Sequence, residues 1–460
     1  MKKVFGIAAL LLALAACNKE TEITPVEQPS DSKGITITAT LAPKTAVTKA
    51  VADKGDNKIT VTWAKNEHIA ILYDKDGAQV ADATITAVDG TTGAATISFT
   101  VVSGTADNTA CTLVYPAKLS NGTTTVYNDE KTGVKDAATL LAAQDGTLNA
   151  NLDVRVGAGT IQTTTPSLTV TTQPAAQFAI FKFTLSGPSI DATHPLVIKD
   201  NASNKTITTV TPASTATSVY VAMPAAASTT YKFVVITADN KYIKSGTATI
   251  EAGKYYQTPL TMSPRYPLDL SSATADDLGA VVNSDGTLSV EKAAAPSGKT
   301  AVGILGKVTE TGHGLILALK DATSQTWDTI NRWESVTTYA DTKLKLLPDE
   351  ARGTNLTSFF WLGVFVDIKV SNWCVAQKSD YEEIFVNLGS TTGNSNGTTY
   401  DGNVNAYITT GVGGTAMAGS YWSATEYYEY VGHYAWGFYS DSWTNYFTTG
   451  SDSVRPVLGF

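Results

Sequence analysis

Short runs of alternating apolar and polar residues fill the first 264 positions, and they constrain the fold more than any other feature. Residues 35–41 read Ile-Thr-Ile-Thr-Ala-Thr-Leu, which places every second side chain on one face of an extended chain. Comparable runs follow at 59–63, 68–73, 96–101 and 111–115. No stretch of this region keeps the 3.6-residue period of a helix. The pattern predicts half-buried strands joined by turns, and therefore a mainly β fold.

A second group of strands follows a Thr- and Pro-rich stretch, residues 162–176, which we interpret as a domain junction. Residues 178–185 are apolar on both faces in their first half, as expected of a central strand. Further strands are predicted at 219–223, 231–236 and 242–250. We therefore expect two tandem β-sandwiches, residues 34–170 and 171–264, without a long helix.

The amino terminus has the composition of an export signal. Lys2 and Lys3 precede an apolar stretch, residues 4–14, that is too short to span a bilayer. Leu-Ala-Ala-Cys then matches the bacterial lipobox, in which the Cys17 thiol is acylated; the alternative is an ordinary signal peptide. Residues 18–33 are polar and contain two prolines, which predicts a tether. We expect residues 1–17 to be a lipoprotein signal peptide, in which acylated Cys17 becomes the new amino terminus, and we expect the mature protein to start out anchored in the outer membrane.

Composition argues against several classes of function. The net charge is −9, and no arginine precedes Arg155, so we expect no nucleic-acid partner. The four histidines are isolated and never at metal-ligand spacing, and Asp74–Gly77 lacks the further carboxylates of a calcium loop, so it predicts a hairpin turn. Phosphate-binding and nucleophile motifs do not occur. We therefore predict no metal, no cofactor and no enzymatic activity.

Residues 265–460 form a third region of mixed character. A hairpin turn is predicted at 284–287, and 301–308 and 313–319 are expected to pair as strands. Residues 373–385 are predicted to form a strand that runs into a helix, with Ser379 or Asp380 as its N-cap. Residues 389–404 are predicted to form a loop. The last forty residues are rich in Trp and Tyr. Such rings form either a small core or a binding face.

The first half resembles a known family. A lipobox, a short alternating strand, a Lys-rich gap and Ile-Thr-Val-Thr-Trp at 59–63 occur in the order found in the fimbrillin family of Bacteroidales pilus subunits, and 178–256 looks like that family's second domain. The resemblance implies two transthyretin-like sandwiches. It also implies that a protease removes the first strand, so that a strand donated by a neighbouring subunit fills the groove.

The exchangeable strand would bury Ile35, Ile37 and Leu41. Better-known family members are cut after an arginine, which this segment lacks. The candidate cleavage positions are therefore Lys44 and Lys49, and either the protease differs or no cleavage occurs.

The last 196 residues resemble the C-type-lectin-like modules, of the Fib_succ_major kind, that end many Bacteroidales surface proteins. The matching segments are 312–315, 318–322, 377–382, 421–426 and 454–457. The resemblance implies an α+β terminal domain, residues 265–460, in which Trp422, Trp436 and Arg455 are structural. The signatures of calcium-dependent sugar binding are absent. The variable stretches supply the candidate ligand contacts, which are Tyr427, Tyr428, Tyr430, Tyr439, Trp443 and Tyr446.

Together the resemblances imply an adhesion protein of the cell surface, and most specifically the tip subunit of an extracellular fimbrium. Its expected partners are other pilus subunits through a donated β-strand, the outer membrane through lipid before processing, and a glycan or a host surface protein. Two alternatives stay open. One is a static surface lipoprotein that binds glycan or host protein, and the other is a carbohydrate-active enzyme.

Overall fold

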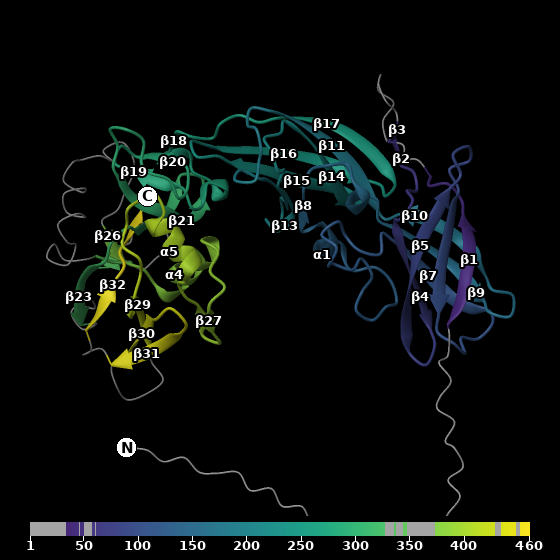
Figure 1. Ribbon diagram of the computed structural model, residues 1–460. Helices are drawn as coiled ribbons and strands as arrows, with labels where there is room; N and C mark the ends of the chain where they lie inside the picture. Colours follow the sequence, from purple (N-terminus) through teal and green to yellow (C-terminus); the bar gives the residue numbers. More distant parts are fainter. Residues whose placement is uncertain are drawn as a thin grey trace, which may run out of the picture. The chain divides into compact units, whose positions relative to one another are not determined.

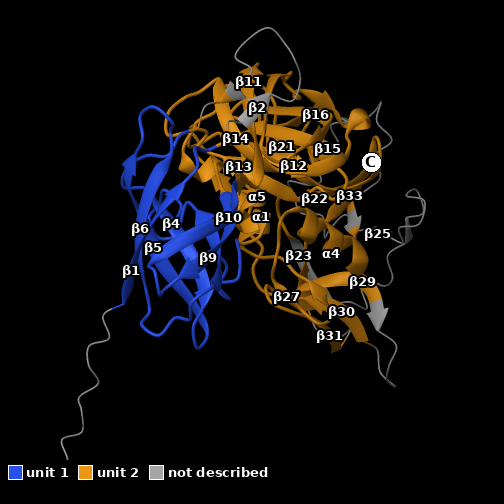
Figure 2. Cartoon of the chain, turned by 90° about the vertical axis from the view of Figure 1, so that its right-hand side faces the viewer, with its two compact units in different colours: residues 1–44, 62–134, 155–174 blue, residues 45–61, 135–154, 175–460 orange. Residues whose placement is uncertain are grey.

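The computed structural model describes residues 34–45, 47–49, 58–59, 61–326, 335–336, 344–346, 373–427, 434–447 and 451–460. The described chain is mainly β, as predicted, and its strands form several separate sheets (Figure 1). It divides into two compact units (Figure 2). The first comprises residues 1–44, 62–134 and 155–174, and the second comprises residues 45–61, 135–154 and 175–460. Within the described residues, no helix is both long and apolar enough to cross a bilayer.

The first unit contains a seven-stranded sheet in the order β1-β6-β5-β4-β7-β9-β10. Its strands are β1 (Ile35–Leu41), β4 (His68–Asp74), β5 (Ala78–Val88), β6 (Ala95–Val101), β7 (Thr109–Tyr115), β9 (Arg155–Gln162) and β10 (Ser167–Ala176). The hairpin turn predicted at 74–77 joins β4 to β5, with Asp76 and Gly77 at positive φ. All five residues from Ile69 to Tyr73 are buried, because β4 lies near the middle of the sheet.

Two expectations for this region need a closer description. The boundary between the two units falls within the predicted junction, between Pro174 and Ala175, but most of the stretch 162–176 is strand, since β10 forms the far edge of the seven-stranded sheet. An edge position tolerates Pro174, which has no N–H to donate. The strand expected at 59–63 is limited to β3 (Lys58–Ile59), and Trp63 is buried outside any strand.

The second unit begins with a β-sandwich. One sheet has the order β14-β11-β17-β2-β3 and the other β16-β15-β12-β13-β8. Their elements are β2 (Val47–Lys49), β3, α1 (Ala137–Leu141), β8 (Ala143–Gln144), η1 (Ala150–Leu152), β11 (Phe178–Ser186), β12 (Leu196–Asp200), β13 (Thr206–Val210), β14 (Ser218–Pro224), β15 (Ala226–Ile236), β16 (Lys241–Ile250) and β17 (Lys254–Thr261). β11 is a central strand, as predicted, and one hydrophobic core joins both sheets.

The rest of the second unit carries a nine-stranded sheet, β18-β20-β19-β21-β22-β33-β26-β25-β24, a five-stranded sheet, β23-β32-β29-β30-β31, and the hairpin β27-β28. Its strands are β18 (Leu268–Asp269), β19 (Val281–Asn283), β20 (Thr287–Ser289), β21 (Ala301–Glu310), β22 (His313–Ala318), β23 (Ala322–Thr326), β24 (Ser335–Val336), β25 (Leu344–Leu346), β26 (Trp373–Val375), β27 (Gly393–Asn394), β28 (Gly397–Thr398), β29 (Tyr421–Tyr427), β30 (Tyr434–Phe438), β31 (Trp443–Phe447), β32 (Ser451–Val454) and β33 (Val457–Gly459). Its helices are η2 (Leu270–Ser272), η3 (Ala275–Asp277), α4 (Lys378–Asn387) and α5 (Gly402–Thr409).

Local predictions in this region are confirmed in part. The turn at 284–287 joins β19 to β20, and β21 pairs with β22. The N-cap prediction is wrong, because α4 begins after Gln377, whose side chain makes no capping hydrogen bond. Asp380 lies inside the first turn and pairs with Lys307 at 2.9 Å. The expected loop at 389–404 contains β27 and β28 and the start of α5.

Candidate functional site

The strand predicted to be exchangeable is an edge strand with one buried face. β1 pairs antiparallel with β6 along its whole length, from Ile35 opposite Val101 to Leu41 opposite Ala95. Ile37 and Leu41 are completely buried, and Ile35 is half-buried. The intervening threonines are exposed. Fully burying an aliphatic side chain of this size stabilises the folded chain by about 1.5–3 kcal/mol. Apolar burial and a single ladder of hydrogen bonds together hold β1 in place.

The first of the two predicted cleavage positions is buried. The Lys44 side chain is 2% exposed, and its Nζ lies 3.7 Å from the ring centroid of Tyr115 and 4.5 Å from that of Trp63. A Glu67 carboxylate oxygen lies 3.8 Å from the same nitrogen. A protease that recognises a basic side chain must take that side chain into its own pocket. The folded chain therefore withholds Lys44 from cleavage.

Lys49, the second predicted cleavage position, lies in β2. The backbone of this strand pairs in parallel with β17, with Lys49 opposite Tyr255. Cleavage of a strand requires the backbone to leave its ladder, so this position is also held. Cys17, the predicted lipidation site, lies outside the described residues.

The aromatic residues near the carboxyl end divide into buried and exposed rings. Trp443, a predicted ligand contact, is completely buried, and its indole Nε1 donates to the carbonyl oxygen of Thr398 at 2.7 Å. Its ring packs against Phe438, with centroids 4.8 Å apart. The ligand-contact prediction is therefore wrong for Trp443, because the core satisfies both its apolar ring and its polar N–H.

Two other predicted contacts lie together near the surface. Tyr439 is 37% exposed, and its ring meets the edge of the half-buried Tyr446 ring at 5.6 Å. Gly437 makes room for Tyr446, since a Cβ there would lie 2.9 Å from that ring. Tyr428 and Tyr430 lie outside the described residues, as does the side chain of Tyr427.

Sequence reasoning missed one exposed ring. Phe447 is 63% exposed and packs against Tyr434 on the neighbouring strand, with ring centroids 4.6 Å apart. The feature that could have identified Phe447 is its spacing from Trp443. It follows Trp443 by four residues in β31 and therefore lies on the same face of the sheet. We call these four residues the terminal aromatic group: Tyr434, Tyr439, Tyr446 and Phe447.

An ion pair between a buried arginine and a partly exposed aspartate supports this region. Arg455 is completely buried, and its Nε lies 2.7 Å from Asp321 Oδ1. The remaining guanidinium nitrogens donate to the carbonyl oxygens of Ala318 and Thr415. Burial raises the pKa of Asp321 although Arg455 opposes the shift. The complete burial of Arg455 and Trp422 agrees with the structural role predicted for both residues.

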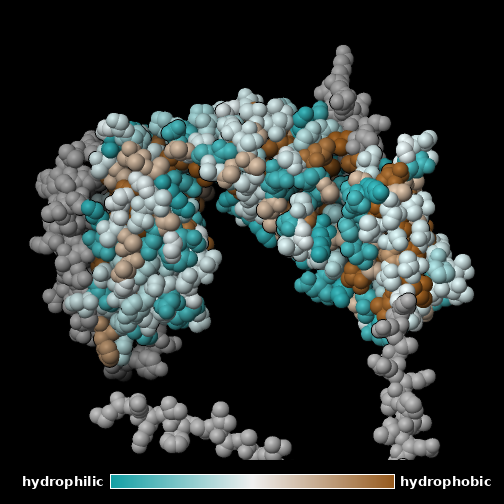
Figure 3. All heavy atoms as spheres, in the orientation of Figure 1, coloured by the Kyte–Doolittle hydropathy of each residue, from teal (hydrophilic) through white to brown (hydrophobic). Residues whose placement is uncertain are grey.

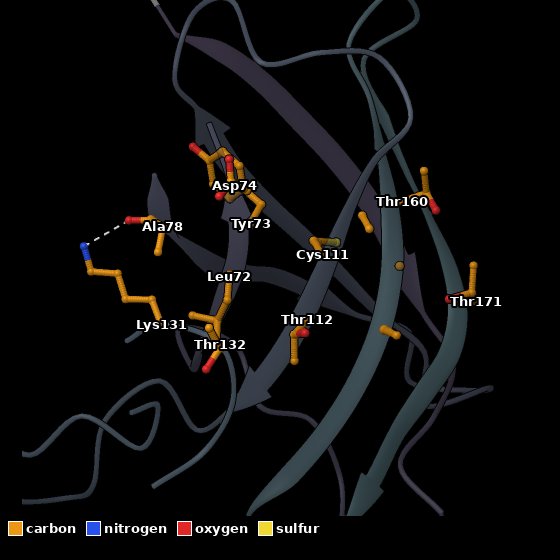
Figure 4. A pocket seen from close by; sticks show the side chains of 13 residues that line it. Leu72, Tyr73, Asp74, Ala78, Cys111, Thr112, Lys131, Thr132, Thr160 and Thr171 are labelled. Atoms are coloured by element: carbon orange, nitrogen blue, oxygen red, sulfur yellow. Dashed lines mark hydrogen bonds between the residues drawn. The ribbon is translucent and has the colours of Figure 1, made fainter. Parts of the chain in front are cut away.

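A pocket of about 500 Å³ opens on the first unit (Figure 4). It is lined mainly by small and polar residues of β4, β7 and β9, with Cys111 on its wall and Lys131 at one side donating to the carbonyl oxygen of Ala78. Burial raises the pKa of Cys111 to about 12, so the thiol is protonated at neutral pH. A protonated thiol is a poor nucleophile.

A second pocket, of about 630 Å³, lies in the second unit and is lined by three lysines and two acids. Lys232 pairs with Asp276, and Lys241 Nζ lies 3.4 Å from Glu291. These pairs connect the sandwich sheet to the segment 266–291. Burial lowers the pKa of Lys199 in the same pocket, and the positive charges of the neighbouring Lys241 and Lys232 lower it further.

The described residues contain no group of three or more His, Cys, Asp or Glu side chains placed to hold a metal ion. Each described histidine instead faces a carboxylate, as in His68–Asp82 at 2.8 Å and His194–Asp191 at 3.2 Å.

The surface offers no broad apolar face in the view of Figure 3, where hydrophobic residues lie in small scattered patches. The large exposed hydrophobic residues of the described chain are similarly dispersed, and they are Val102, Leu148, Val386, Tyr439 and Phe447. β1 is an edge element whose buried residues alternate with exposed ones.

No family model and no curated protein matches this sequence. Among solved structures, it is similar to a fimbrial protein from Bacteroides ovatus, at 12% identity over 93% of this chain and 100% of that one, with a TM-score of 0.25. It is also similar to a fimbrial assembly protein from Parabacteroides distasonis, at 15% identity over 49% of this chain and 90% of that one, with a TM-score of 0.29. At these identities and TM-scores, the similarities assign no function to this chain.

Proposed function

We propose that this protein is a fimbrial adhesion protein of the cell surface, whose first strand is replaced by a strand donated from a neighbouring subunit. The observation that carries the proposal is β1. It is an edge strand, its buried face alternates regularly, and it directly follows the segment predicted to be a lipidated tether. Departure of β1 would uncover an apolar groove and a row of backbone donors and acceptors on β6. This is the surface that an added strand requires.

The position within the fimbrium that we propose is the tip. β33 lies between β22 and β26 in the nine-stranded sheet, and Phe460 beside it is buried. Donating this strand would dismantle the centre of a sheet. The chain is therefore suited to accept a strand at β1 and unsuited to donate one from β33.

The terminal aromatic group is where we propose that the target binds. Tyr439 and Phe447 are its exposed members, whereas Tyr434 and Tyr446 are half-buried. Because Tyr446 and Phe447 are neighbours in β31, they lie on opposite faces of the sheet, and the target would contact one of the two faces. Exposed rings of this kind stack on sugars and serve as anchors in protein interfaces. A glycan and a host surface protein are both compatible with this chemistry.

A second candidate is a static surface lipoprotein anchored through Cys17. The observation that favours it is the burial of Lys44 together with the pairing of Lys49, because both protect the intact chain from cleavage.

Mass spectrometry of the amino terminus, on protein isolated from its native cell surface, separates the two candidates. A chain that begins after Lys44 or Lys49, without lipid and in high-mass assemblies, supports strand exchange. An intact monomer that begins at acylated Cys17 refutes it and leaves the static lipoprotein.

A further inference from the structure

The groups around Lys44 form a complete binding site for a cation. Trp63 and Tyr115 meet edge to face at 5.1 Å and present their rings to the same ammonium group. Glu67 supplies the opposite charge, and its own side chain is 25% exposed. A desolvated ammonium over an aromatic face is attracted by the ring, and the nearby carboxylate adds to that attraction. We call Trp63, Glu67 and Tyr115 the aromatic cage.

The body of the unit holds Glu67 and Tyr115 of the aromatic cage in place. The Tyr115 hydroxyl donates to one oxygen of Glu67 at 2.8 Å, and the backbone N–H of Ala64 donates to the other at 2.9 Å. Tyr115 is the last residue of β7, inside the sheet. Glu67 and Tyr115 therefore keep these contacts when the segment that carries Lys44 leaves, whereas the Trp63 indole gives up its hydrogen bond to the Ala42 carbonyl oxygen.

The cation itself belongs to the segment that leaves. Lys44 follows Leu41 by three residues, and Leu41 is the last buried position of β1. The Trp63 indole donates to the carbonyl oxygen of Ala42 at 2.8 Å, which fixes the backbone between strand and cage. The distance along the chain from the buried face of the strand to the cage is thus set by the structure.

We infer that the aromatic cage selects the donated strand by a basic residue placed three positions after its last buried apolar side chain. This inference rests on the proposed strand exchange. An incoming strand that fills only the apolar groove leaves Glu67 without its cation and two ring faces uncovered. A strand with Lys or Arg at that position restores each contact that Lys44 makes. The partner is therefore a strand with alternating apolar residues followed by a cation.

Peptide binding to the full mature chain tests this inference. A recognition sequence for a specific protease, inserted after Thr45, allows β1 to be cut from the otherwise complete chain. The probe is a labelled peptide with the sequence ITITATLAPK, residues 35–44, and its displacement by unlabelled variants is followed by fluorescence anisotropy. The uncut chain is the control, because its tethered β1 should exclude the probe.

We expect Lys→Gln at the last position of the peptide to weaken binding about tenfold, and Lys→Arg to change it less than threefold. Thr→Ala at the position of Thr38, whose side chain is exposed, should have almost no effect. The E67Q chain should lose most of the preference for Lys over Gln, since glutamine keeps the shape and removes the charge. Loss of a preference, rather than of binding, distinguishes recognition from a general effect on folding.

The outcomes distinguish selection of a basic residue by the cage from strand exchange itself. Equal binding of the Lys, Arg and Gln peptides to the cut chain would overturn the inference and leave strand exchange standing. Failure of every peptide to bind would overturn both. Hydrogen exchange of the uncut chain gives an independent measurement, in which K44Q should speed exchange of the β1 amides about tenfold while K44R should not. Unchanged exchange in K44Q would also contradict the inference.

Discussion

Truncating Ile37 to alanine should loosen β1 without unfolding the rest of the chain. Ile37 is completely buried and lies opposite Phe99, on a strand that only one ladder holds. Replacing a buried Ile by Ala costs about 2–5 kcal/mol, depending on how far the site can collapse. An edge strand can shift inward more easily than a central one, so we expect a loss near 2 kcal/mol. That loss corresponds to a roughly 30-fold increase in the population of the detached strand.

Hydrogen exchange with peptide resolution is the appropriate assay, because a chain with two compact units does not unfold as one two-state system. The I37A variant should exchange the amides of β1 and the facing amides of β6 roughly 30-fold faster, with β4, β7 and β9 unchanged. The matched control is T38A, one residue along the same strand with an exposed side chain, which should differ by less than about 0.5 kcal/mol. Equal exchange in the two variants, or acceleration across the whole sheet, would refute the description of β1 as a separable edge strand.

Further predictions concern the second unit and the thiol of Cys111. Trp443→Ala should destabilise the second unit by about 3–5 kcal/mol in thermal unfolding, because it empties a buried site. Tyr439→Ala should leave the stability within about 0.5 kcal/mol of the unchanged chain and weaken binding on a glycan or host-protein array. Equal stabilities of the two variants would contradict the assignment of Trp443 to the core. Burial alone would raise the pKa of Asp277, but hydrogen bonds from Arg265 and Thr274 outweigh it and hold that pKa below its usual range. A carboxylate with a depressed folded pKa contributes stability above its unfolded pKa of about 3.9 and loses it as the pH falls through the folded value. The D277N variant should therefore be less stable than the unchanged chain at pH 7, and its stability should depend less on pH below about 4. Parallel curves of stability against pH for the two chains would contradict a stabilising Asp277–Arg265 pair. Cys111 should resist alkylation at pH 8 in the folded chain and react on denaturation, as measured by peptide mass spectrometry; rapid labelling of the native protein would show that the thiol is accessible.

Local periodicity predicted those features that depend on neighbouring residues. The alternation in residues 35–41 correctly predicted both the strand and its buried face, because side chains in an extended chain alternate whatever the partner strand is. The turn residues at 74–77 and 284–287 likewise identified two hairpins.

Features that depend on distant residues could not be predicted in this way. Thr48 pairs with Lys254, more than two hundred positions later, and no local pattern marks either partner. Trp63 looked like the end of a strand because its neighbours alternate, but its burial depends on Lys44 and Tyr115. Trp443 has the same amphipathic character as an exposed ring, and only the position of the Thr398 carbonyl shows that its N–H is satisfied inside the core.

The path of the chain between the two units has a consequence for how the protein can be made and divided. Residues 45–61 and 135–154 belong to the second unit, although they are synthesised before the first unit is complete at residue 174. A fragment that starts at residue 175 would therefore lack β2, which covers the edge of β17, and β8, which covers the edge of β13. Uncovered edges of this kind promote aggregation. Gene fragments cut at the apparent domain borders are thus expected to yield insoluble protein. During export the first unit cannot finish folding until residue 174 has emerged, and the segments 45–61 and 135–154 must wait for the chain beyond residue 175 before they can pack.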